Sequence, residues 1–380
     1  MIMEILKKGI VYRVNEGPFR YQAWPSLCQD ENGKLYAVCS GHRSSHVCPF
    51  GKDLMFTSED GGESWSVPSI INDTWLDDRD AGITYLGNGK MIVSWFNHPA
   101  VIYRTIWRNW IVGDAEEEFK PFIEGFLKGY ESYTPEQDRA GSFIRLSDDY
   151  GKSWSDPIKT VVSAPHGPVK TISGRLLYVG RDFPGIPSRY EGFKGDDPRV
   201  DTMPEEFRNA LFLYESFDDG KSWEEVSMLP TVEGVDNEKL CEPHLVEATD
   251  GEIIVAIRAH VDPIYDNFTV YFRSSKDGGK TWGDMWGLGK IGSPPHLLLR
   301  KDGSIVVTYG RRSAPFGIRA VVSYDNCRTF SEEFILSDAR NGDLGYPATT
   351  ELADGSLVTV YYQPYGDDLR TSILYTKWEI

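Results

Sequence analysis

The sequence lacks any excess of positive charge. It has 40 Lys and Arg residues against 57 Asp and Glu, which gives a formal net charge of −17 at pH 7 and a pI of about 4.9 over 380 residues. An acidic surface of this kind argues against a protein that binds nucleic acid or an anionic membrane. A basic pocket inside the acidic shell is still compatible with this net charge.

Signals for export and for membrane insertion are also missing. No apolar run approaches the length of a transmembrane helix, and the N-terminal stretch MIMEILKKGIVYRV has neither an apolar core nor a small-residue cleavage site. The cysteines are odd in number and form no CxxC pair; they are Cys28, Cys39, Cys48, Cys241 and Cys327. We therefore expect a reduced, cytoplasmic protein without a membrane partner.

Motifs for cofactors and metals are absent as well. The sequence has no Walker loop, no GxGxxG after a strand-like segment, and no HExxH or similar spacing among its seven histidines. It therefore predicts neither an organic cofactor nor a metal site.

A short turn signature, Ser-x-Asp-x-Gly-x-x-Trp, is abundant instead. Its four full copies span residues 58–65, 147–154, 216–223 and 275–282. A fifth copy at 323–330 keeps Ser and Asp but has Cys327 and Phe330 in place of Gly and Trp. The Asp can accept backbone N–H bonds within the turn, the Gly supplies a positive φ, and the Trp anchors the hairpin in apolar surroundings. Four full copies indicate a repeat architecture.

A second repeat alternates with the first. Hairpin turns centred on glycine precede apolar, β-rich segments; the glycines are Gly33, Gly89, Gly174, Gly251, Gly303 and Gly355. Together the two repeats predict six four-stranded units, at about 18–72, 79–160, 164–230, 240–290, 292–338 and 344–380. Residues 5–14 would supply the missing outer strand of the last unit. We therefore predict an all-β, six-bladed β-propeller in one domain, 1–380; a β-sandwich pair does not explain this period.

Two segments interrupt the repeats. Residues 107–140 are acidic, aromatic and partly helical in period, and residues 183–209 are rich in Pro and Gly. Both fall between the second and third strands of a unit. Long inserts of this kind usually form walls or lids of a functional site, and surface decoration is the alternative interpretation.

One end of the predicted propeller collects reactive side chains. Gly turns and Asp turns fall on one end, so the other end carries the residues before each first strand and after each second strand. All seven histidines are placed there: His42, His46, His98, His166, His244, His260 and His296. The arginines and carboxylates placed on the same end are Arg43, Arg181, Arg258, Arg311, Arg312, Asp77, Asp78, Asp80, Asp182 and Glu242. We predict that this end is the active or binding face.

Tyr346 lies at the start of the first strand of the sixth unit, near the axis, and is the candidate nucleophile. A carboxylate at Glu242 could draw the phenolic proton and activate Tyr346 near neutral pH. Arg258 and Arg312 could hold a substrate carboxylate or sulfate in a bidentate manner. A plain salt-bridge network among the Arg and Glu residues is the alternative.

The Asp turns, together with Glu242 and Arg258 on either side of one hairpin, resemble those of the sialidase superfamily of Asp-box propellers. The resemblance covers essentially the whole chain and implies three arginines that clamp a sugar carboxylate, a Tyr–Glu nucleophile pair and an Asp as acid/base. By position it implies Tyr346 and Glu242 as the pair and Arg258 with Arg311 or Arg312 as clamp residues. Arg43 matches an arginine that contacts the sugar.

Two positions depart from the pattern of that superfamily. The opening Phe/Tyr-Arg-Ile-Pro reads Gln22-Ala23-Trp24-Pro25 here, so the first clamp arginine is missing, and Arg20 or Arg43 is a substitute. Where the acid/base Asp is expected, the chain reads SSHVCPFGKD, and His46 is the nearest proton carrier. Both changes lie in one blade and suggest a substrate other than that of a standard sialidase.

The leading hypothesis is an exo-acting glycoside hydrolase for an anionic sugar or glycan fragment. Its predicted catalytic residues are Tyr346, Glu242, His46 and Asp80, with His46 or one of Asp77–Asp80 as proton donor. Its predicted substrate-binding residues are Trp24, Arg43, Arg79, His166, Arg181, His244, Arg258, His296, Arg311 and Arg312. The alternatives are a lyase for uronic-acid glycans, which needs a carboxylate neutraliser and a Tyr or His base, and a non-catalytic carbohydrate-binding propeller.

Overall fold

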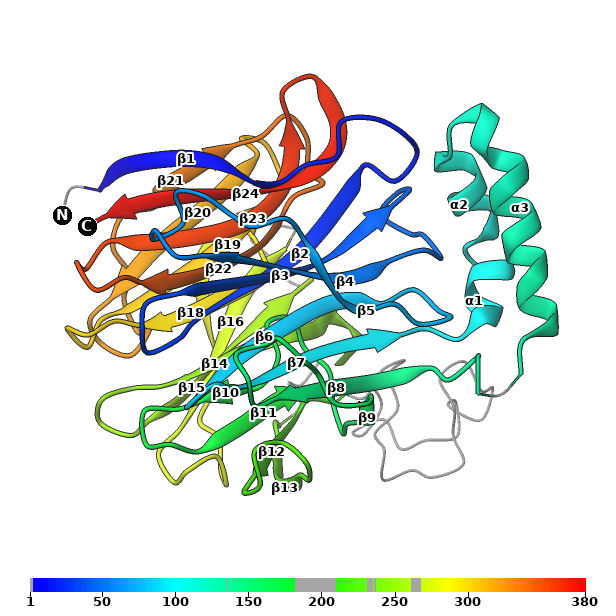
Figure 1. Cartoon of the computed structure of the whole chain (residues 1–380). Coiled ribbons are helices and arrows are strands. Elements are labelled where there is room, and N and C mark those ends of the chain that lie inside the picture. Colours follow the sequence, from blue (N-terminus) through cyan, green and yellow to red (C-terminus); the bar gives the residue numbers. More distant parts are fainter. Residues whose placement is uncertain (1–2, 135, 182–209, 231–234, 236, 261–267) are drawn as a thin grey trace.

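The computed structural model describes residues 3–134, 136–181, 210–230, 235, 237–260 and 268–380. Six four-stranded antiparallel sheets surround a common axis (Figure 1), which confirms the predicted all-β, six-bladed propeller. In each of the first five blades the strands follow one another from the axis outward in chain order. Among the described residues, no helix has the length and apolar character needed to cross a membrane.

The first three blades contain the strands β2 to β13. Blade 1 consists of β2 (Tyr21–Gln29), β3 (Leu35–Arg43), β4 (Lys52–Ser58) and β5 (Ser69–Asn72). Blade 2 consists of β6 (Arg79–Gly87), β7 (Lys90–Asn97), β8 (Gly141–Ser147) and β9 (Ile158–Lys159). Blade 3 consists of β10 (Val169–Lys170), β11 (Leu176–Gly180), β12 (Phe212–Ser216) and β13 (Glu224–Met228).

The last three blades complete the ring. Blade 4 consists of β14 (Leu240–Glu247), β15 (Ile253–Ala259), β16 (Thr269–Ser275) and β17 (Trp286–Ile291), preceded by the short helix η5 (Asn237–Lys239). Blade 5 consists of β18 (Pro295–Leu299), β19 (Ile305–Arg311), β20 (Gly317–Ser323) and β21 (Phe334–Asp338). Blade 6 consists of β22 (Gly345–Glu351), β23 (Leu357–Tyr365), β24 (Asp368–Glu379) and β1 (Glu4–Tyr12).

The two ends of the chain close the propeller within blade 6. Strand β1 pairs antiparallel with β24, for example Ile10 opposite Leu374, and the two termini lie side by side (Figure 1). The predicted outer strand from residues 5–14 is therefore confirmed. Closure of this kind ties the two ends of the chain into one sheet and so holds the ring of blades together.

The Asp turns are held by the hydrogen bonds that their sequence predicts. In the first turn Asp60 accepts the backbone N–H groups of Glu63 and Ser64 at 3.0 and 2.9 Å, and Ser58 Oγ accepts that of Gly62 at 2.9 Å. The Ser64 hydroxyl also donates a hydrogen bond to Asp60. This bond contributes most, and the backbone bonds add to it, in lowering the pKa of Asp60 to about 2. In the fifth turn Cys327 adopts the left-handed conformation (φ 63°) where the other copies have glycine.

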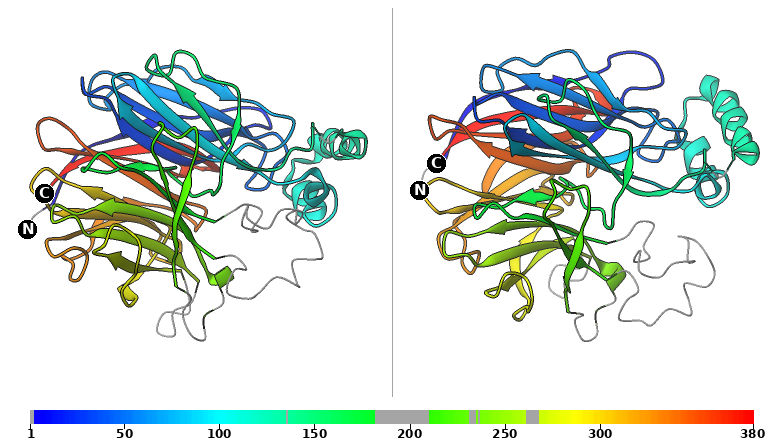
Figure 2. Two further views of the ribbon diagram at one scale, coloured as in Figure 1. Left: turned by 90° about the horizontal axis from the view of Figure 1, so that it is seen from below. Right: turned by 60° about the horizontal axis from the view of Figure 1, so that its bottom comes forward.

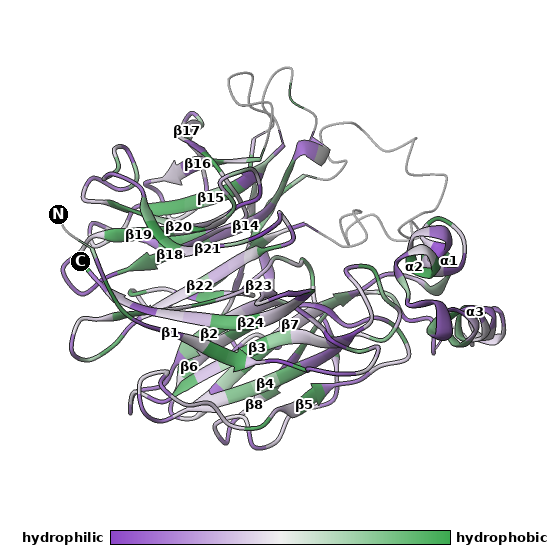
Figure 3. Cartoon of the chain, turned by 90° about the horizontal axis from the view of Figure 1, so that it is seen from above, coloured by the Kyte–Doolittle hydropathy of each residue, from purple (hydrophilic) through white to green (hydrophobic). Residues whose placement is uncertain are grey.

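The hydrophobic core lies between neighbouring blades. Trp65 of the first Asp turn packs against a buried cluster that includes Leu35 of blade 1 and Val358 of blade 6. The equivalent Trp154 packs against a buried cluster that includes Val38 of blade 1 and Met91 of blade 2. Figure 3 shows that the hydrophobic stretches lie within the strands, whereas the connecting turns are largely hydrophilic. The turn tryptophans therefore join one blade to the next.

The insert between β7 and β8 forms a helical unit. It contains α1 (Ala100–Arg104), α2 (Arg108–Asp114), η1 (Glu117–Phe119), α3 (Lys120–Gly129) and η2 (Tyr130–Ser132). These helices stand to one side of the propeller, at the end away from the chain termini (Figures 1 and 2). Ile111 and Leu127 pack there with Val47 and Leu76 of the propeller loops. The second predicted insert, 183–209, lies outside the described residues.

Candidate active site

The innermost strands of four blades share one irregularity. In blades 1, 2, 4 and 6 the innermost strand carries a β-bulge, at which it has one residue more than the neighbouring strand. In blade 4, for example, two residues separate Cys241 from His244, whereas only one separates their partners Arg258 and Ala256. At each of these β-bulges a non-glycine residue has a left-handed φ: Trp24 at 51°, Asp80 at 53°, Glu242 at 46° and Tyr346 at 48°. Such strained residues cluster at functional sites.

These four residues line a single pocket of about 280 Å³, to which Trp107 and Trp110 of the helical insert also contribute. Nine of the predicted site residues line it: Trp24, His46, Arg79, Asp80, Arg181, Glu242, Arg258, Arg312 and Tyr346. The volume is close to the lower limit of ordinary ligand pockets, roughly 300 Å³. A pocket of this size can hold one small ring-shaped ligand.

Tyr346 and Glu242 are in direct contact at the base of this pocket. The Tyr346 hydroxyl donates to Glu242 Oε1 at 2.8 Å. Arg258 Nη1 donates to Glu242 Oε2 at 2.5 Å and to the Tyr346 hydroxyl at 3.3 Å. Tyr346 is 4% exposed and Arg258 8%, whereas the Glu242 side chain is 22% exposed. The three groups form one hydrogen-bonded unit.

The charges around this unit determine its protonation. Burial alone raises the pKa of Glu242, but Arg258 outweighs it and holds that pKa below its ordinary value. Burial and the negative charges of Glu242 and Asp80 raise the pKa of Tyr346 well above its ordinary value. At neutral pH Glu242 is therefore an anion and Tyr346 a neutral phenol, which is the arrangement needed for base-assisted attack by the phenol.

Four arginines give the pocket a positive wall. Arg312 is fixed by hydrogen bonds from Nε to the Leu344 carbonyl at 2.8 Å and from Nη2 to the Tyr362 hydroxyl at 2.9 Å. Its guanidinium lies 5.5 Å from the centre of the Tyr346 ring. Arg79, Arg181 and Arg258 line the same pocket, so an anionic group can be held next to Tyr346 although the chain is acidic overall.

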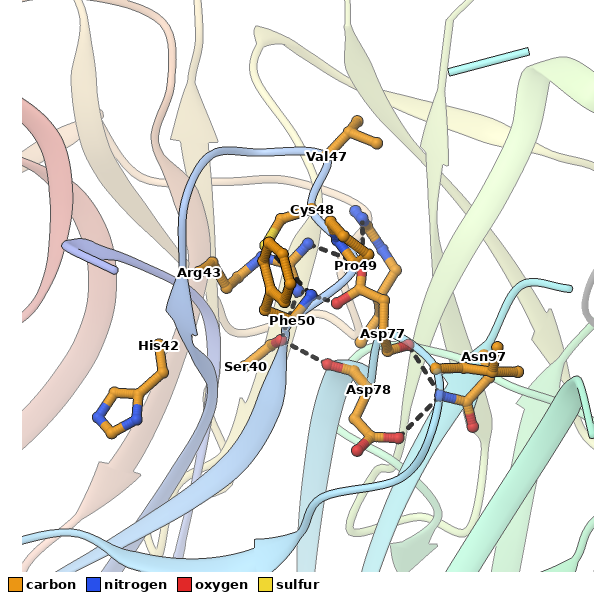
Figure 4. A network of polar contacts seen from close by, with 12 residues as sticks. Ser40, His42, Arg43, Val47, Cys48, Pro49, Phe50, Asp77, Asp78 and Asn97 are labelled. Atoms are coloured by element: carbon orange, nitrogen blue, oxygen red, sulfur yellow. Dashed lines mark hydrogen bonds and ion pairs between the residues drawn. The ribbon is translucent and has the colours of Figure 1, made fainter. Parts of the chain in front are cut away.

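Arg43, expected to contact the sugar, is instead part of the support behind the pocket. Its guanidinium is fully buried and paired with both carboxylate oxygens of Asp77 (Figure 4). Asp77 also accepts Arg79 Nη1 at 3.2 Å. The Trp24 ring lies within 4.6 Å of the Arg43 guanidinium and 4.2 Å of that of Arg79. Because Arg43 does not line the pocket, its role is to hold Trp24, Asp77 and Arg79 in place.

Asp80 has the properties of a proton donor. It is 7% exposed, and its Oδ1 has no hydrogen-bond partner among the described residues. Burial raises the pKa of Asp80 to about 7, with Glu242 adding to the rise and Arg79 opposing it. The neighbouring Asp77 is ion-paired, and Asp78 accepts bonds from Thr74 and Asn97 (Figure 4). Asp80 is thus the acid of residues 77–80 that faces the pocket.

His46 lies on the loop after β3 and contacts the carboxylate of Asp343. Its Nδ1 lies 3.2 Å from Asp343 Oδ1 and 2.7 Å from the Tyr21 hydroxyl, and Tyr21 donates to Asp343 at 2.9 Å. Since the Tyr21 proton goes to Asp343, this network assigns the His46 proton to Nδ1 and leaves a lone pair on Nε2. Burial lowers the pKa of His46 although Asp343 opposes this, so the imidazole is neutral and is a base rather than an acid at rest.

The helical insert supplies an aromatic wall that the sequence did not assign to the site. Trp107 and Trp110 line the pocket, and the Trp110 ring stacks on His46 at 6.1 Å with an interplanar angle of 13°. Trp107 meets His98 edge to face at 4.6 Å. The available signal was the Trp-x-x-Trp spacing within a segment already predicted to be a wall or lid.

Several predicted residues lie away from the pocket. His166, His244 and His296 line a separate cavity on the axis, so the prediction that all seven histidines share one rim is wrong. The reason is the period of two in a strand: His244 follows Glu242 by two positions and points to the axis one layer deeper. Arg311 does not line the pocket, and Arg20, considered as a substitute clamp, pairs with Glu116 and Asp368.

The blades, the Asp turns and this pocket together define a propeller of the sialidase-like superfamily. The chain belongs to the BNR repeat-like domain family, whose sequence profile matches residues 134–359. No curated protein sequence matches the chain.

Solved structures with the same fold cover nearly the whole chain. A protein of unknown function from Dyadobacter fermentans has a TM-score of 0.70 at 20% identity over 100% of this chain and 99% of its own. The NanB sialidase from Streptococcus pneumoniae has a TM-score of 0.67 at 15% identity over 98% and 70% of the two chains. The α-L-arabinanase from Penicillium chrysogenum has a TM-score of 0.59 at 14% identity over 98% of each chain. At such identities the likeness concerns the fold.

Proposed function

We propose that the protein is an exo-acting glycoside hydrolase that removes a terminal anionic sugar. The observation that carries this proposal is the 2.8 Å hydrogen bond from Tyr346 to Glu242 in a small pocket that four arginines line. A tyrosine nucleophile is a known exception to the carboxylate pairs of most glycosidases. Solved structures of similar fold include a sialidase and an arabinanase, which is consistent with action on a glycan.

In the first step Glu242 takes the phenolic proton while the Tyr346 oxygen attacks the anomeric carbon. The bond to the leaving group breaks, and Asp80 gives its proton to the departing glycosidic oxygen. In the second step the Asp80 carboxylate takes a proton from water, and the water oxygen attacks the anomeric carbon. Tyr346 leaves and recovers its proton from Glu242. Two displacements at one carbon give retention of configuration.

The arginines determine the charge of the substrate. Arg258 and Arg312 flank Tyr346, and Arg79 and Arg181 complete the positive wall. A carboxylate on the sugar bound by these guanidiniums would place the anomeric carbon above the tyrosine. Ala23 stands where the first clamp arginine is expected, and the next residue, Trp24, presents its ring to the Arg79 guanidinium at 4.2 Å. We therefore expect a substrate whose ring packs on tryptophan and whose anionic group lies toward Arg258 and Arg312.

The test is a parallel screen of sialosides, uronides and other anionic glycosides, with mass spectrometry of the products. Wild-type protein and the Tyr346→Phe variant are assayed side by side. The proposal predicts release of a monosaccharide from the non-reducing end by wild type and not by the variant. Equal turnover by both proteins would refute the role of Tyr346, and release of internal fragments would refute exo action.

A lyase acting on uronic-acid glycans is the second candidate, because His46 is a neutral base supported by Asp343. In that reaction His46 would take the proton α to the carboxylate, and an arginine would stabilise the resulting anion. The product would contain a conjugated double bond, whose ultraviolet absorbance separates the two reactions in the same screen. A purely carbohydrate-binding role is less well supported, since it has no need of the Tyr346–Glu242 contact.

A further inference from the structure

A second cavity, of about 290 Å³, lies on the propeller axis and shares no lining residue with the candidate active site. All six innermost strands contribute to it. Its outer lining includes Gln29, Tyr85 and Thr350, which lie just before the Gly turns, so it opens at the opposite end of the propeller. Its inner part is formed by His166, His244 and His296 of blades 3, 4 and 5.

The three histidines lie close enough to bind one small species together. Their ring centres are 4.4 Å apart for His244 and His296, 4.9 Å for His166 and His296, and 5.4 Å for His166 and His244. The corresponding positions in blades 1, 2 and 6 are the small residues Ser26, Gly82 and Ala348. At Gly82 the missing side chain lets the backbone of His166 and Gly167 approach closely. All three imidazoles are at least nine-tenths buried.

Backbone hydrogen bonds determine which nitrogens carry protons. His244 Nδ1 accepts the Leu297 N–H at 3.0 Å, and His296 Nδ1 accepts the Thr349 N–H at 3.4 Å. Burial lowers the pKa of His244 to about 3 and that of His296 well below its ordinary value, so both rings are neutral. A neutral ring that accepts at Nδ1 carries its proton on Nε2. Both histidines therefore present an N–H donor, not a lone pair.

His166 supplies the independent sign of a missing ligand. Neither of its ring nitrogens has a hydrogen-bond partner among the described residues, although the side chain is 4% exposed. A buried polar group without a partner costs free energy unless something absent from the protein chain satisfies it. The unpaired ring lines the same cavity as the two donors of His244 and His296.

We propose that the three axial histidines bind a small inorganic anion of the size of chloride through their N–H groups. A metal cation fits poorly because the Nδ1 lone pairs of His244 and His296 are used by the backbone. In agreement, no three His, Cys, Asp or Glu side chains in the described part of the chain are arranged to hold a metal ion. The anion would fill the axis one layer below Glu242 and join blades 3, 4 and 5 where no strand pairing connects them.

Diffraction from crystals grown with sodium bromide in place of chloride tests the proposal directly. We expect an anomalous bromide peak on the axis in hydrogen-bonding contact with His244 and His296 Nε2. Density on the axis that has no anomalous signal at the bromide edge, or peaks at the protein surface only, would overturn the proposal. This measurement uses the wild-type protein and needs no substrate.

Thermal unfolding provides the test in solution. At equal ionic strength, sodium chloride should raise the Tm of wild type by a few °C over sodium gluconate, on the scale expected when a ligand exceeds its Kd about a hundredfold. The His244→Leu and His296→Leu variants should lose this difference, and the exposed control His260→Gln should keep it. A chloride effect that survives in both leucine variants, or stabilisation by Zn²⁺ that depends on His244, would contradict the anion site. If neither leucine variant folds, the bromide crystals decide.

Discussion

Glu242 and Tyr346 occupy the same position on two different blades. Each is the left-handed residue of a β-bulge in an innermost strand, with φ of 46° and 48°, and their side chains meet at 2.8 Å across 104 residues of sequence. The propeller repeat thus brings together two groups that no local pattern connects. Because the bulges belong to rigid strands rather than to flexible loops, the pair is held in position before any substrate binds.

Removal of the Tyr346 hydroxyl should abolish turnover with little effect on folding. The Tyr346→Phe variant keeps the ring that packs among Trp24 and Tyr362 but has no nucleophile. We expect kcat to fall by roughly 10³-fold or more. Tyr362→Phe, which removes the hydroxyl that fixes Arg312, is the matched control and should change KM more than kcat. Equal kinetic losses in the two variants would contradict the assignment.

Replacement of Asp80 should show separately its role as a proton donor and the free energy that its burial costs. We expect Asp80→Asn to lower kcat by about 10²- to 10⁴-fold. In wild type the activity should fall as pH rises above about 7, where Asp80 loses its proton. The exposed Asp367, whose side chain is 98% exposed, provides the control variant Asp367→Asn, which should retain the wild-type pH profile.

The Asp80→Asn variant should also be more stable than wild type at alkaline pH. Because the folded-state pKa of Asp80 is raised, the stability linked to its proton is complete below about pH 4 and is lost as pH rises to about 7. Above pH 7 the buried charge costs up to about 4 kcal/mol, given a shift of about three pKa units. Urea unfolding at pH 5 and pH 8 should show an advantage of Asp80→Asn that grows with pH. An advantage that is constant or shrinks would refute the raised pKa.

Arg312 and Arg311 are neighbours in the chain, but only Arg312 lines the pocket. Arg312→Lys loses the planar fork that bonds Leu344 and Tyr362 and would hold a carboxylate. We expect KM to rise by roughly 10- to 100-fold, which corresponds to about 1.4 to 2.8 kcal/mol of binding free energy. Arg311→Lys should leave KM unchanged. Steady-state kinetics on an anionic substrate and its neutral analogue would show whether the loss depends on the substrate charge.

Trp110 tests the role of the helical insert. Its ring is 48% exposed and stacks on His46, so Trp110→Ala should weaken substrate binding several-fold with little loss of stability, within about 0.5 kcal/mol. Trp75 is 60% exposed and does not line the pocket; Trp75→Ala is therefore the control. Similar KM values for the two variants would show that the insert does not contact the substrate.

The sequence predicted the fold well because its signals are local. The Asp turn at 58–65 and the glycine turns carry their own hydrogen bonds and backbone requirements, so each can be recognised without its partners. The contact of Glu242 with Tyr346 could be proposed because the predicted propeller places both residues at one end, and the resemblance to a known superfamily supported the pairing. The depth of a side chain along the axis could not be predicted. Glu242 and His244 are two positions apart in the chain, yet Glu242 lines the pocket and His244 lines the cavity below it.

The burial of individual side chains was not predictable from the sequence either. Arg43 matched a sugar-contacting position, but its guanidinium is paired with Asp77, and nothing near Arg43 in the chain indicates this partner. Likewise, the pairing of His46 with Asp343 joins blade 1 to the segment before β22. Such contacts depend on how blades pack against one another, and one sequence without its relatives does not encode them in any local pattern.

In the proposed mechanism Tyr346 forms a covalent bond to the sugar, and this bond can be detected directly. A fluorinated glycosyl fluoride of the substrate sugar, in which fluorine beside the anomeric carbon slows breakdown of the intermediate, should trap it. Mass spectrometry of the intact protein and of its peptides should then find one glycosyl unit on the peptide that contains Tyr346. A label on any other residue, or normal turnover of the true substrate without a trapped adduct, would show that Tyr346 is not the nucleophile.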